Sequence, residues 1–293
     1  MLINKIKNSL AFRLPIIYKL IISYFYVSAI RRKSIITNEY TLVMMCGIRQ
    51  LPMLKVCLRS IYKQFSNLPH IILFTDLSSD MDQFKKALSL FPAGSISIVS
   101  GYDCINHHRR NKKNQLVSFA EKNPMGLKLA TILQTLESKK SVLYCDTDVI
   151  WYGDPYAIIH QHITNPNFDM AMSEDFQAAY DKHLIDNANL IKLYDKPYFC
   201  AGILLIKELS VNNQETLNRL LETVSEKSDH FSEQTIFAFL NRESNNILLD
   251  KNKFVIRTDD QFQIKPKRVP GILARHYTGP VRHIFWRDAF FRI

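Results

Sequence analysis

The chain has 293 residues, of which 47% are hydrophobic and 22% are charged, and it contains 8 glycines and 11 prolines. This composition is that of a globular protein with one large domain or two small ones, and it excludes fibrous and strongly disordered classes. The formal net charge of +11 indicates contact with phosphates, in nucleic acid, at a membrane surface or in a nucleotide substrate.

The first predicted element is a strongly apolar stretch, LPIIYKLIISYFYVSAI, at residues 14–30, with cations on both sides. It is shorter than the roughly 20 residues that span a bilayer, and no signal-peptide cleavage site follows it. Its aromatic residues beside lysines suit a helix that lies in a membrane interface with anionic lipids. A helix packed on the protein and a short true anchor are the alternatives. Residues 1–37 are therefore assigned to a basic apolar segment and residues 38–293 to a single domain.

Strands and helices alternate along the first half of that domain. Strands are expected at residues 40–48, 70–77, 95–102 and from 142, and helices at 52–65, 81–91 and 124–136. This order predicts a largely parallel sheet covered by helices on both faces, with ligands bound at the carboxyl ends of its strands. The second half is less regular, with strands expected at 168–175, 198–207 and 254–262, and helices at 212–228 and from an N-cap at Ser232.

Two aspartates interrupt the apolar stretch VLYCDTDVIW, at residues 142–151. In an extended segment, residues i and i+2 point to the same side, so Asp146 and Asp148 are expected to project together. Two such carboxylates repel each other unless a cation joins them, and oxygen ligands favour Mg²⁺ or Mn²⁺ completed by water and substrate phosphate. The alternative is a pair that ends a strand and is capped by turn amides and water.

VLYCDTDVIWYGDP resembles the DxD segment of nucleotide-sugar glycosyltransferases of the GT-A type. RHYTGPVRHIFW, at residues 275–286, is similar to the H-[YF]-x-G-x-x-K-P-W segment of glycosyltransferase family 8, which includes bacterial lipopolysaccharide glucosyl- and galactosyltransferases and glycogenin. The resemblance implies a Rossmann-like α/β fold, with a mixed, mostly parallel sheet in one catalytic domain. It also implies that Asp146, Asp148 and His276 hold Mn²⁺ or Mg²⁺.

The same resemblance implies further roles at the donor site. Asp146 and Gly279 would lie at the nucleotide-sugar, and Arg282 would take the place of the family lysine on the phosphates. Glu233 and Gln234 match an Asp-Gln pair that faces the donor sugar, although ordinary first-turn helix residues are the alternative.

The roles of two more positions, and of one basic segment, are left open by the sequence. Lys128 is a candidate phosphate or sugar contact, with a solvated lysine as the alternative. In YFCAGILLIK, Cys200 stands where family members carry an asparagine that helps to hold the sugar or acceptor, which puts sugar specificity in doubt. The basic run HHRRNKK, at residues 107–113, has no family counterpart and is interpreted as a lid over the diphosphate, an acceptor-phosphate site or a solvated loop.

These patterns together predict a retaining, metal-dependent transferase that moves a hexose from a nucleoside-diphosphate sugar, most simply a UDP-sugar, to a glycan or lipid-linked acceptor in surface polysaccharide or lipopolysaccharide synthesis. The alternatives are a haloacid-dehalogenase-like Mg²⁺ phosphatase that uses the DxD, with TDD at residues 258–260 as a later acidic pair, and a non-catalytic membrane-surface adaptor. The basic residues are not interleaved with stacking aromatics, so no nucleic-acid partner is expected.

The cysteines bear on the compartment. They are odd in number and show no CxxC spacing, which predicts reduced, mostly buried thiols; they are Cys46, Cys57, Cys104, Cys145 and Cys200. We therefore expect a cytoplasmic protein, peripheral on the inner face of the plasma membrane if residues 14–30 bind lipid. In a eukaryotic host the same stretch would be a Golgi anchor.

Overall fold

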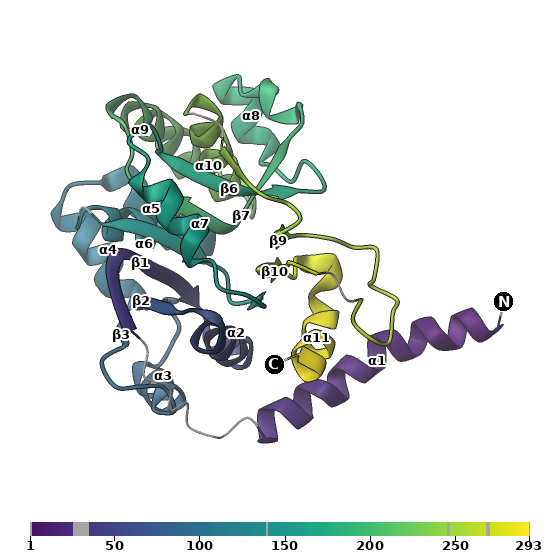
Figure 1. Cartoon of the computed structure of the whole chain (residues 1–293). Coiled ribbons are helices and arrows are strands. Elements are labelled where there is room, and N and C mark those ends of the chain that lie inside the picture. The colour runs from purple at the N-terminus through teal and green to yellow at the C-terminus, as the bar shows by residue number, and fades with distance from the viewer. Residues whose placement is uncertain (1, 26–34, 139, 245–246, 268–269, 293) are drawn as a thin grey trace.

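The computed structural model describes residues 2–25, 35–138, 140–244, 247–267 and 270–292. Within these residues, seven strands form a central sheet (Figure 1). In spatial order they are β3 (Ile96–Val99), β2 (Asn67–Thr75), β1 (Ile35–Cys46), β4 (Ser141–Cys145), β7 (Tyr198–Ile206), β6 (Met170–Asp175) and β8 (Ile247–Leu249). Only β7 runs against the others in this described sheet, so the sheet is mixed and mostly parallel.

A second, smaller sheet forms beside the first. Its order is β5 (Val149–Trp151), β10 (Ala274–His276) and β9 (Phe254–Val255). The strand expected at residues 254–262 is therefore only two residues long. Beyond Val255 the chain leaves the sheet, and Asp260, farther along the expected strand, is fully buried and held by arginines.

Helices cover the large sheet on both sides (Figure 1). The helices are α1 (Leu2–Phe25), α2 (Leu51–Gln64), α3 (Met81–Leu88), α4 (Gly101–Arg110), α5 (Asn114–Lys122), α6 (Pro124–Leu136), α7 (Tyr156–Thr164), α8 (Lys182–Ala188), α9 (Val211–Glu226), α10 (Ser232–Glu243) and α11 (Phe285–Arg292), with 3-10 turns η1 (Ile48–Gln50), η2 (Ile191–Tyr194) and η3 (Gly279–Ile284). Val142 and Tyr144 of β4 pack into the core with α4, α5, α6, α9 and α10, whereas Leu143 and Cys145 pack with α2 and α3. Strand side chains alternate between faces in this way when both faces are covered.

Helix α1 lies along α11 (Figure 1) and also contacts η3. The predicted helix thus forms over residues 14–25; the rest of the predicted stretch, 26–30, lies outside the described residues, as do Arg31, Arg32 and Lys33. Among the helices of the described residues, none is both long and apolar enough to cross a bilayer. All five cysteines are buried and free, as the sequence predicted.

Two local predictions are wrong. Residues 100–102 do not extend the third strand, because the Ser100 side chain accepts a hydrogen bond from the Tyr102 amide and caps α4. Ser232 is not the N-cap of α10: Phe231 occupies that position, and the Ser232 hydroxyl donates to the carboxylate of Asp181.

Candidate active site

Asp146 and Asp148 lie on the turn that joins β4 to β5. The Val149 amide donates to the Asp146 carbonyl at 3.3 Å, and the Asp146 amide donates to the Gly202 carbonyl of β7 at 2.9 Å. The pair was predicted to lie in an extended segment, and this is wrong. The turn nevertheless brings the two carboxylates together at the carboxyl end of β4, which is the edge where parallel sheets bind ligands.

The pairing of β5 with β10 brings His276 to this turn. His276 stands opposite Val149 in the antiparallel ladder, and the Tyr277 amide donates to the Asp148 carbonyl at 2.9 Å. The His276 Nε2 atom is 3.1 Å from Asp148 Oδ1 and 3.6 Å from Asp146 Oδ2. Two motifs that are far apart in the sequence therefore meet in one place.

The three side chains fit a divalent cation. One donor atom from each of Asp146, Asp148 and His276 lies within 4.8 Å of the other two. Two carboxylates and one imidazole supply the oxygen and nitrogen ligands that Mn²⁺ accepts, and the like-charged carboxylates gain from a shared cation. The predicted metal ligands are thus brought together.

Electrostatics at the cluster keep Asp148 ionised. Burial raises the pKa of Asp148, but the neighbouring His276 and Arg282 more than offset burial and lower this pKa to about 2. Burial lowers the pKa of His276, and its contacts with Cys200 and Asp148 raise it well above its usual range. An anionic Asp148 is the form that ligates a metal.

Arg282 reaches the same carboxylate from η3. Its Nη2 and Nε atoms lie 2.7 and 2.9 Å from Asp148 Oδ2, while 59% of its side chain stays exposed. A Cβ atom added to Gly279, at the start of η3, would meet nothing within 4 Å. The segment thus offers an accessible guanidinium and open space beside the acidic turn, where the phosphates were expected.

Lys128 of α6 is a buried cation between two acids. Its Nζ atom lies 2.9 Å from the Ala201 carbonyl, 3.4 Å from Asp146 Oδ1 and 3.3 Å from Glu233 Oε1, and only 4% of the residue is exposed. The solvated-lysine alternative is therefore wrong. Burial lowers the pKa of Lys128, but Asp146 and Glu233 raise it above its usual range, so the ammonium keeps its charge.

Glu233 and Gln234 open α10 close to Lys128. Burial raises the pKa of Glu233 to about 7, because Lys128 offsets only part of the desolvation. The Gln234 side chain donates to the Ala179 carbonyl at 2.8 Å and accepts from the Ala201 amide at 3.3 Å. Glu233 thus joins the buried charges of the site, whereas the Gln234 amide is bonded to the backbone.

Two neighbours of the cluster, Gly202 and Tyr144, were not recognised from the sequence, and Cys200 was singled out only as a sugar or acceptor position. A Cβ atom on Gly202 would lie 2.1 Å from His276 Cε1, so only glycine leaves room for the imidazole. Cys200 Sγ is 3.4 Å from His276 Nδ1, and the Tyr144 hydroxyl donates to Asp146 Oδ1 at 2.8 Å. Glycine inside the predicted strand 198–207 was the available signal, since such a glycine marks a close approach.

The later acidic pair of the phosphatase alternative does not belong to this site. Asp260 is fully buried, and Arg275 and Arg287 contact its carboxylate at 2.7 and 2.9 Å. Asp259 is exposed and pairs with Lys267 at 3.0 Å. Asp260 therefore serves the packing of the C-terminal segment.

The basic run at residues 107–113 lies at the opposite end of the strands from the acidic turn. It ends α4 and leads into α5, where Lys113 and His107 pair with Glu137 at 2.5 and 2.6 Å. Glu137 follows α6 and precedes β4, so it lies at the amino end of β4, whereas the acidic turn follows the carboxyl end. The lid interpretation is therefore wrong.

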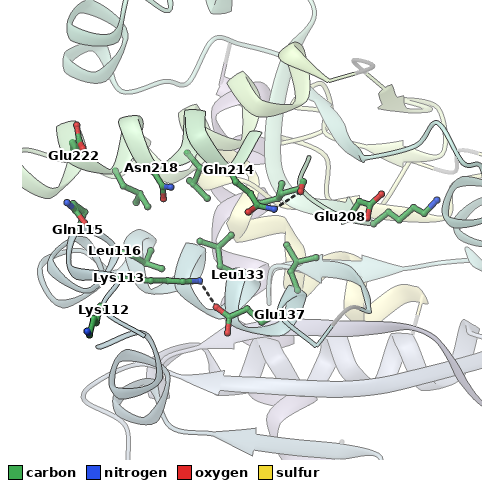
Figure 2. A pocket seen from close by; sticks show the side chains of 15 residues that line it. Lys112, Lys113, Gln115, Leu116, Leu133, Glu137, Glu208, Gln214, Asn218 and Glu222 are labelled. Atoms are coloured by element: carbon green, nitrogen blue, oxygen red, sulfur yellow. Dashed lines mark hydrogen bonds and ion pairs between the residues drawn. The ribbon is translucent and has the colours of Figure 1, made fainter. Parts of the chain in front are cut away.

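A pocket of about 870 Å³ lies beside that run (Figure 2). Its polar lining includes three lysines and three glutamates, which are Lys112, Lys113, Lys207, Glu137, Glu208 and Glu222. This balance of charge does not favour a phosphate, so the acceptor-phosphate interpretation gains no support here.

Known proteins share both sequence pattern and fold with this chain. A model of the family described as nucleotide-diphospho-sugar transferase matches residues 99–265, which include Asp146 and Asp148 but end before His276. No curated protein matches.

Solved structures resemble the chain more broadly. It is similar to mouse xyloside xylosyltransferase 1 at 12% identity, with a TM-score of 0.58 over 83% of this chain and 98% of that one. It is similar to the galactosyltransferase LgtC, solved with donor and acceptor sugar analogues, at 14% identity, with a TM-score of 0.50 over 82% of this chain and 87% of that one. It is also similar to the bifunctional glycosyltransferase WbbM at 12% identity, with a TM-score of 0.51 over 90% of this chain and 51% of that one. These likenesses show the fold and confirm the predicted GT-A architecture.

Proposed function

Because the chain belongs to the nucleotide-diphospho-sugar transferase family and is a GT-A glycosyltransferase, we propose that it transfers a hexose from a UDP-sugar to a glycan or lipid-linked acceptor with the help of Mn²⁺ or Mg²⁺. The meeting of Asp146, Asp148 and His276 carries this proposal. Two carboxylates and an imidazole beside an exposed arginine suit a metal-bound diphosphate.

The side chains around the turn have separable tasks. A divalent ion held by Asp146, Asp148 and His276 would supply Lewis-acid stabilisation of the leaving diphosphate. Arg282 is exposed and cationic, so it binds the phosphate oxygens on which negative charge grows. Lys128 holds Asp146 and Glu233 in place from the buried side.

We propose that Glu233 faces the donor sugar, whereas Gln234, whose amide is bonded to the backbone of Ala179 and Ala201, supports it from the same turn of α10. Glu233 is 2% exposed and lies across Lys128 from the acidic turn, where its carboxylate can orient sugar hydroxyls or face the positive charge of an oxocarbenium-like transition state. In a retaining reaction the leaving phosphate oxygen takes the proton of the acceptor hydroxyl, so this site needs no separate strong base. We propose retention on the resemblance to family 8.

The acceptor class is proposed from the names of similar proteins. One is a xyloside xylosyltransferase and another a galactosyltransferase solved with a sugar acceptor analogue. We propose from these names that a sugar hydroxyl is the acceptor group and that the reaction belongs to surface polysaccharide or lipopolysaccharide synthesis.

The test is a panel of nucleotide-sugars incubated with the purified full chain and Mn²⁺, with release of free nucleoside diphosphate as the measurement. UDP release from a UDP-hexose, lost with a chelator and restored by Mn²⁺, is the expected result. Release of phosphate from small phosphomonoesters would instead support the phosphatase alternative. No activity toward either substrate class would support the non-catalytic adaptor. For retention, the anomeric configuration of the product is read by NMR.

A further inference from the structure

Helix α1 has two unlike faces. Ala11, Pro15 and Ile22 are buried, and the Tyr18 ring stacks on Phe290 of α11 with 4.6 Å between ring centroids. These positions recur at helical spacing, so they form the face that holds α1 to the rest of the chain. Through this face α1 packs on η3 and α11, as one alternative for residues 14–30 expected.

The opposite face of α1 is apolar as well. Ile16 is 62% exposed, Ile17 50%, Leu20 66% and Leu10 40%. A helix that packs on a globular protein normally turns polar residues to water, and a helix apolar on both sides is normally covered on both. Four large aliphatic side chains on one free face form a contiguous patch of the kind that marks an interaction site.

The charge around this patch is of one sign. Residues 1–38 contain seven lysines and arginines and no aspartate or glutamate. Lys5 and Arg13 are exposed on α1 itself, and Arg13 lies on the helix face of Ile17 and Leu20. Apolar side chains flanked by cations match the chemistry of an anionic bilayer, in which acyl chains lie beneath negative headgroups.

We propose that the outer face of α1, formed by Leu10, Arg13, Ile16, Ile17 and Leu20, docks on an anionic lipid bilayer. The helix lies along the surface, with its aliphatic side chains at the boundary between headgroups and acyl chains. Its opposite face stays packed on η3 and α11. Because an α-helix is roughly 10 Å thick, η3 then lies about one helix diameter above the lipid.

This docking connects the lipid to the segment that carries Arg282. The Phe12 ring of α1 stacks on His283 with 4.2 Å between centroids and 20° between planes, and His283 is the neighbour of Arg282. The membrane-facing helix is therefore in direct contact with the segment from which Arg282 reaches Asp148. The proposal does not rest on the proposed donor chemistry, because lipid binding is measured without any nucleotide-sugar.

The test is sedimentation of the full chain with vesicles of phosphatidylcholine alone and of phosphatidylcholine mixed with phosphatidylglycerol. We expect binding to the mixed vesicles that weakens when the salt concentration rises from about 0.1 M to about 0.5 M. The triple variant Ile16→Asn, Ile17→Asn, Leu20→Asn is expected to bind at least about tenfold more weakly, and Arg13→Glu roughly tenfold more weakly.

Ile191→Asn is the matched control. Ile191 in η2 is 67% exposed, close to the exposure of Ile16, so the same substitution is made at an equally accessible site. The control is expected to bind vesicles like the unmodified chain, and all variants are expected to keep its melting temperature because the side chains are exposed. Equal binding by the triple variant and the control would overturn the proposal.

Sedimentation velocity without lipid tests the alternative that a second copy of the chain covers the outer face of α1. If the unmodified chain is a dimer, the triple variant a monomer, and neither binds the mixed vesicles, then a second copy covers this face and the proposal is wrong. The proposal is supported if the unmodified chain binds the mixed vesicles and has the same oligomeric state as the triple variant.

Discussion

Two clusters of buried charge adjoin on β10, and they are built differently. Arg275 contacts Asp260 at 2.7 Å and Asp288 at 3.0 Å, and Arg287 contacts the same two carboxylates at 2.9 and 2.6 Å. Two guanidinium groups thus match two carboxylates, each at hydrogen-bonding distance. Arg257 also lies 3.3 Å from Asp260, so both carboxylates of this cluster are held by arginines, and we assign the cluster to stability.

His276, the next residue along β10, belongs to the looser cluster. It lies 3.6 Å from Asp146, and Lys128 lies 3.4 Å from the same carboxylate. Glu233 adds a third acid, whose pKa is raised to about 7 because burial outweighs its lysine. Incomplete pairing of buried charge is costly to stability, and its presence here marks the place where a cation and a substrate are expected. Adjacent residues of one strand thus serve the fold and the site.

The largest expected effect comes from a substitution in the looser cluster, at the acidic turn. Asp148→Ala should lower Mn²⁺-dependent UDP release at least about a hundredfold, because it removes a proposed metal ligand and the partner of Arg282. The assay is initial rate against Mn²⁺ concentration. Asp154→Ala, at an exposed aspartate in the turn that follows, is the matched control and should retain activity. Full activity in Asp148→Ala would disprove the site.

The second prediction breaks the tight cluster. Asp260→Asn should lower the free energy of unfolding by about 3–5 kcal/mol at neutral pH, because two arginines lose a buried partner. Asp259→Asn, at the exposed neighbour that pairs with Lys267, should cost less than about 1 kcal/mol. Denaturant unfolding of both variants gives the comparison, and equal losses would contradict it.

The loss in Asp260→Asn should depend on pH. Burial raises the pKa of Asp260, but Arg275, Arg287 and Arg257 more than offset it and lower this pKa below its ordinary value of 3.8. A lowered carboxyl pKa stabilises the fold fully above the ordinary value, and this stabilisation is lost as the pH falls toward the folded-state pKa. The difference between the two proteins should therefore stay constant above about pH 5 and shrink in more acidic solution.

A smaller effect is expected when the space beside the His276 imidazole is filled. Gly202→Ala places a methyl group where the imidazole lies, so we expect Mn²⁺ affinity to fall about 10- to 100-fold as for other losses of ligand support. The affinity is measured by calorimetric titration. In a His276→Ala background the same change should have little further effect, since the clash is gone. Additive losses would show that Gly202 acts by another route.

The smallest expected effect concerns Cys200. Cys200→Ser keeps a small polar group 3.4 Å from His276 Nδ1, so activity should change less than about threefold. Initial rates at saturating donor and Mn²⁺ provide the measurement. A loss as large as that of Asp148→Ala would assign the thiol a direct part in the reaction.

The metal cluster could be predicted from sequence because its members sit in two recognisable motifs. The DTD and RHYTG segments carry the resemblance that implied the GT-A fold and the ligands Asp146, Asp148 and His276, and the alternation of strands and helices predicted a largely parallel sheet. The sequence did not show how the motifs meet, since β5 and β10 are three residues each and carry no strong periodicity.

The features that could not be predicted depend on burial and on distant partners. Lys128 looks like any helix lysine, and only packing against Ala201 and Glu233 shows that it is enclosed. Similarly, the run 107–113 is basic enough to suggest a phosphate lid, yet Glu137 and Glu121 pair with it. Partners that are distant in sequence cannot be read from a local pattern.

The pairing of β5 with β10 has a consequence for the order of folding. It closes a loop that contains every element from α7 to β9, and closing a long loop costs chain entropy before any contact repays it. We therefore expect the parallel strands β1 to β4 to form early and the three donor atoms to meet last. A refolding chain should regain its helical signal before it can bind Mn²⁺. The bound ion should then stabilise the closed loop, because it joins residues on both sides of it.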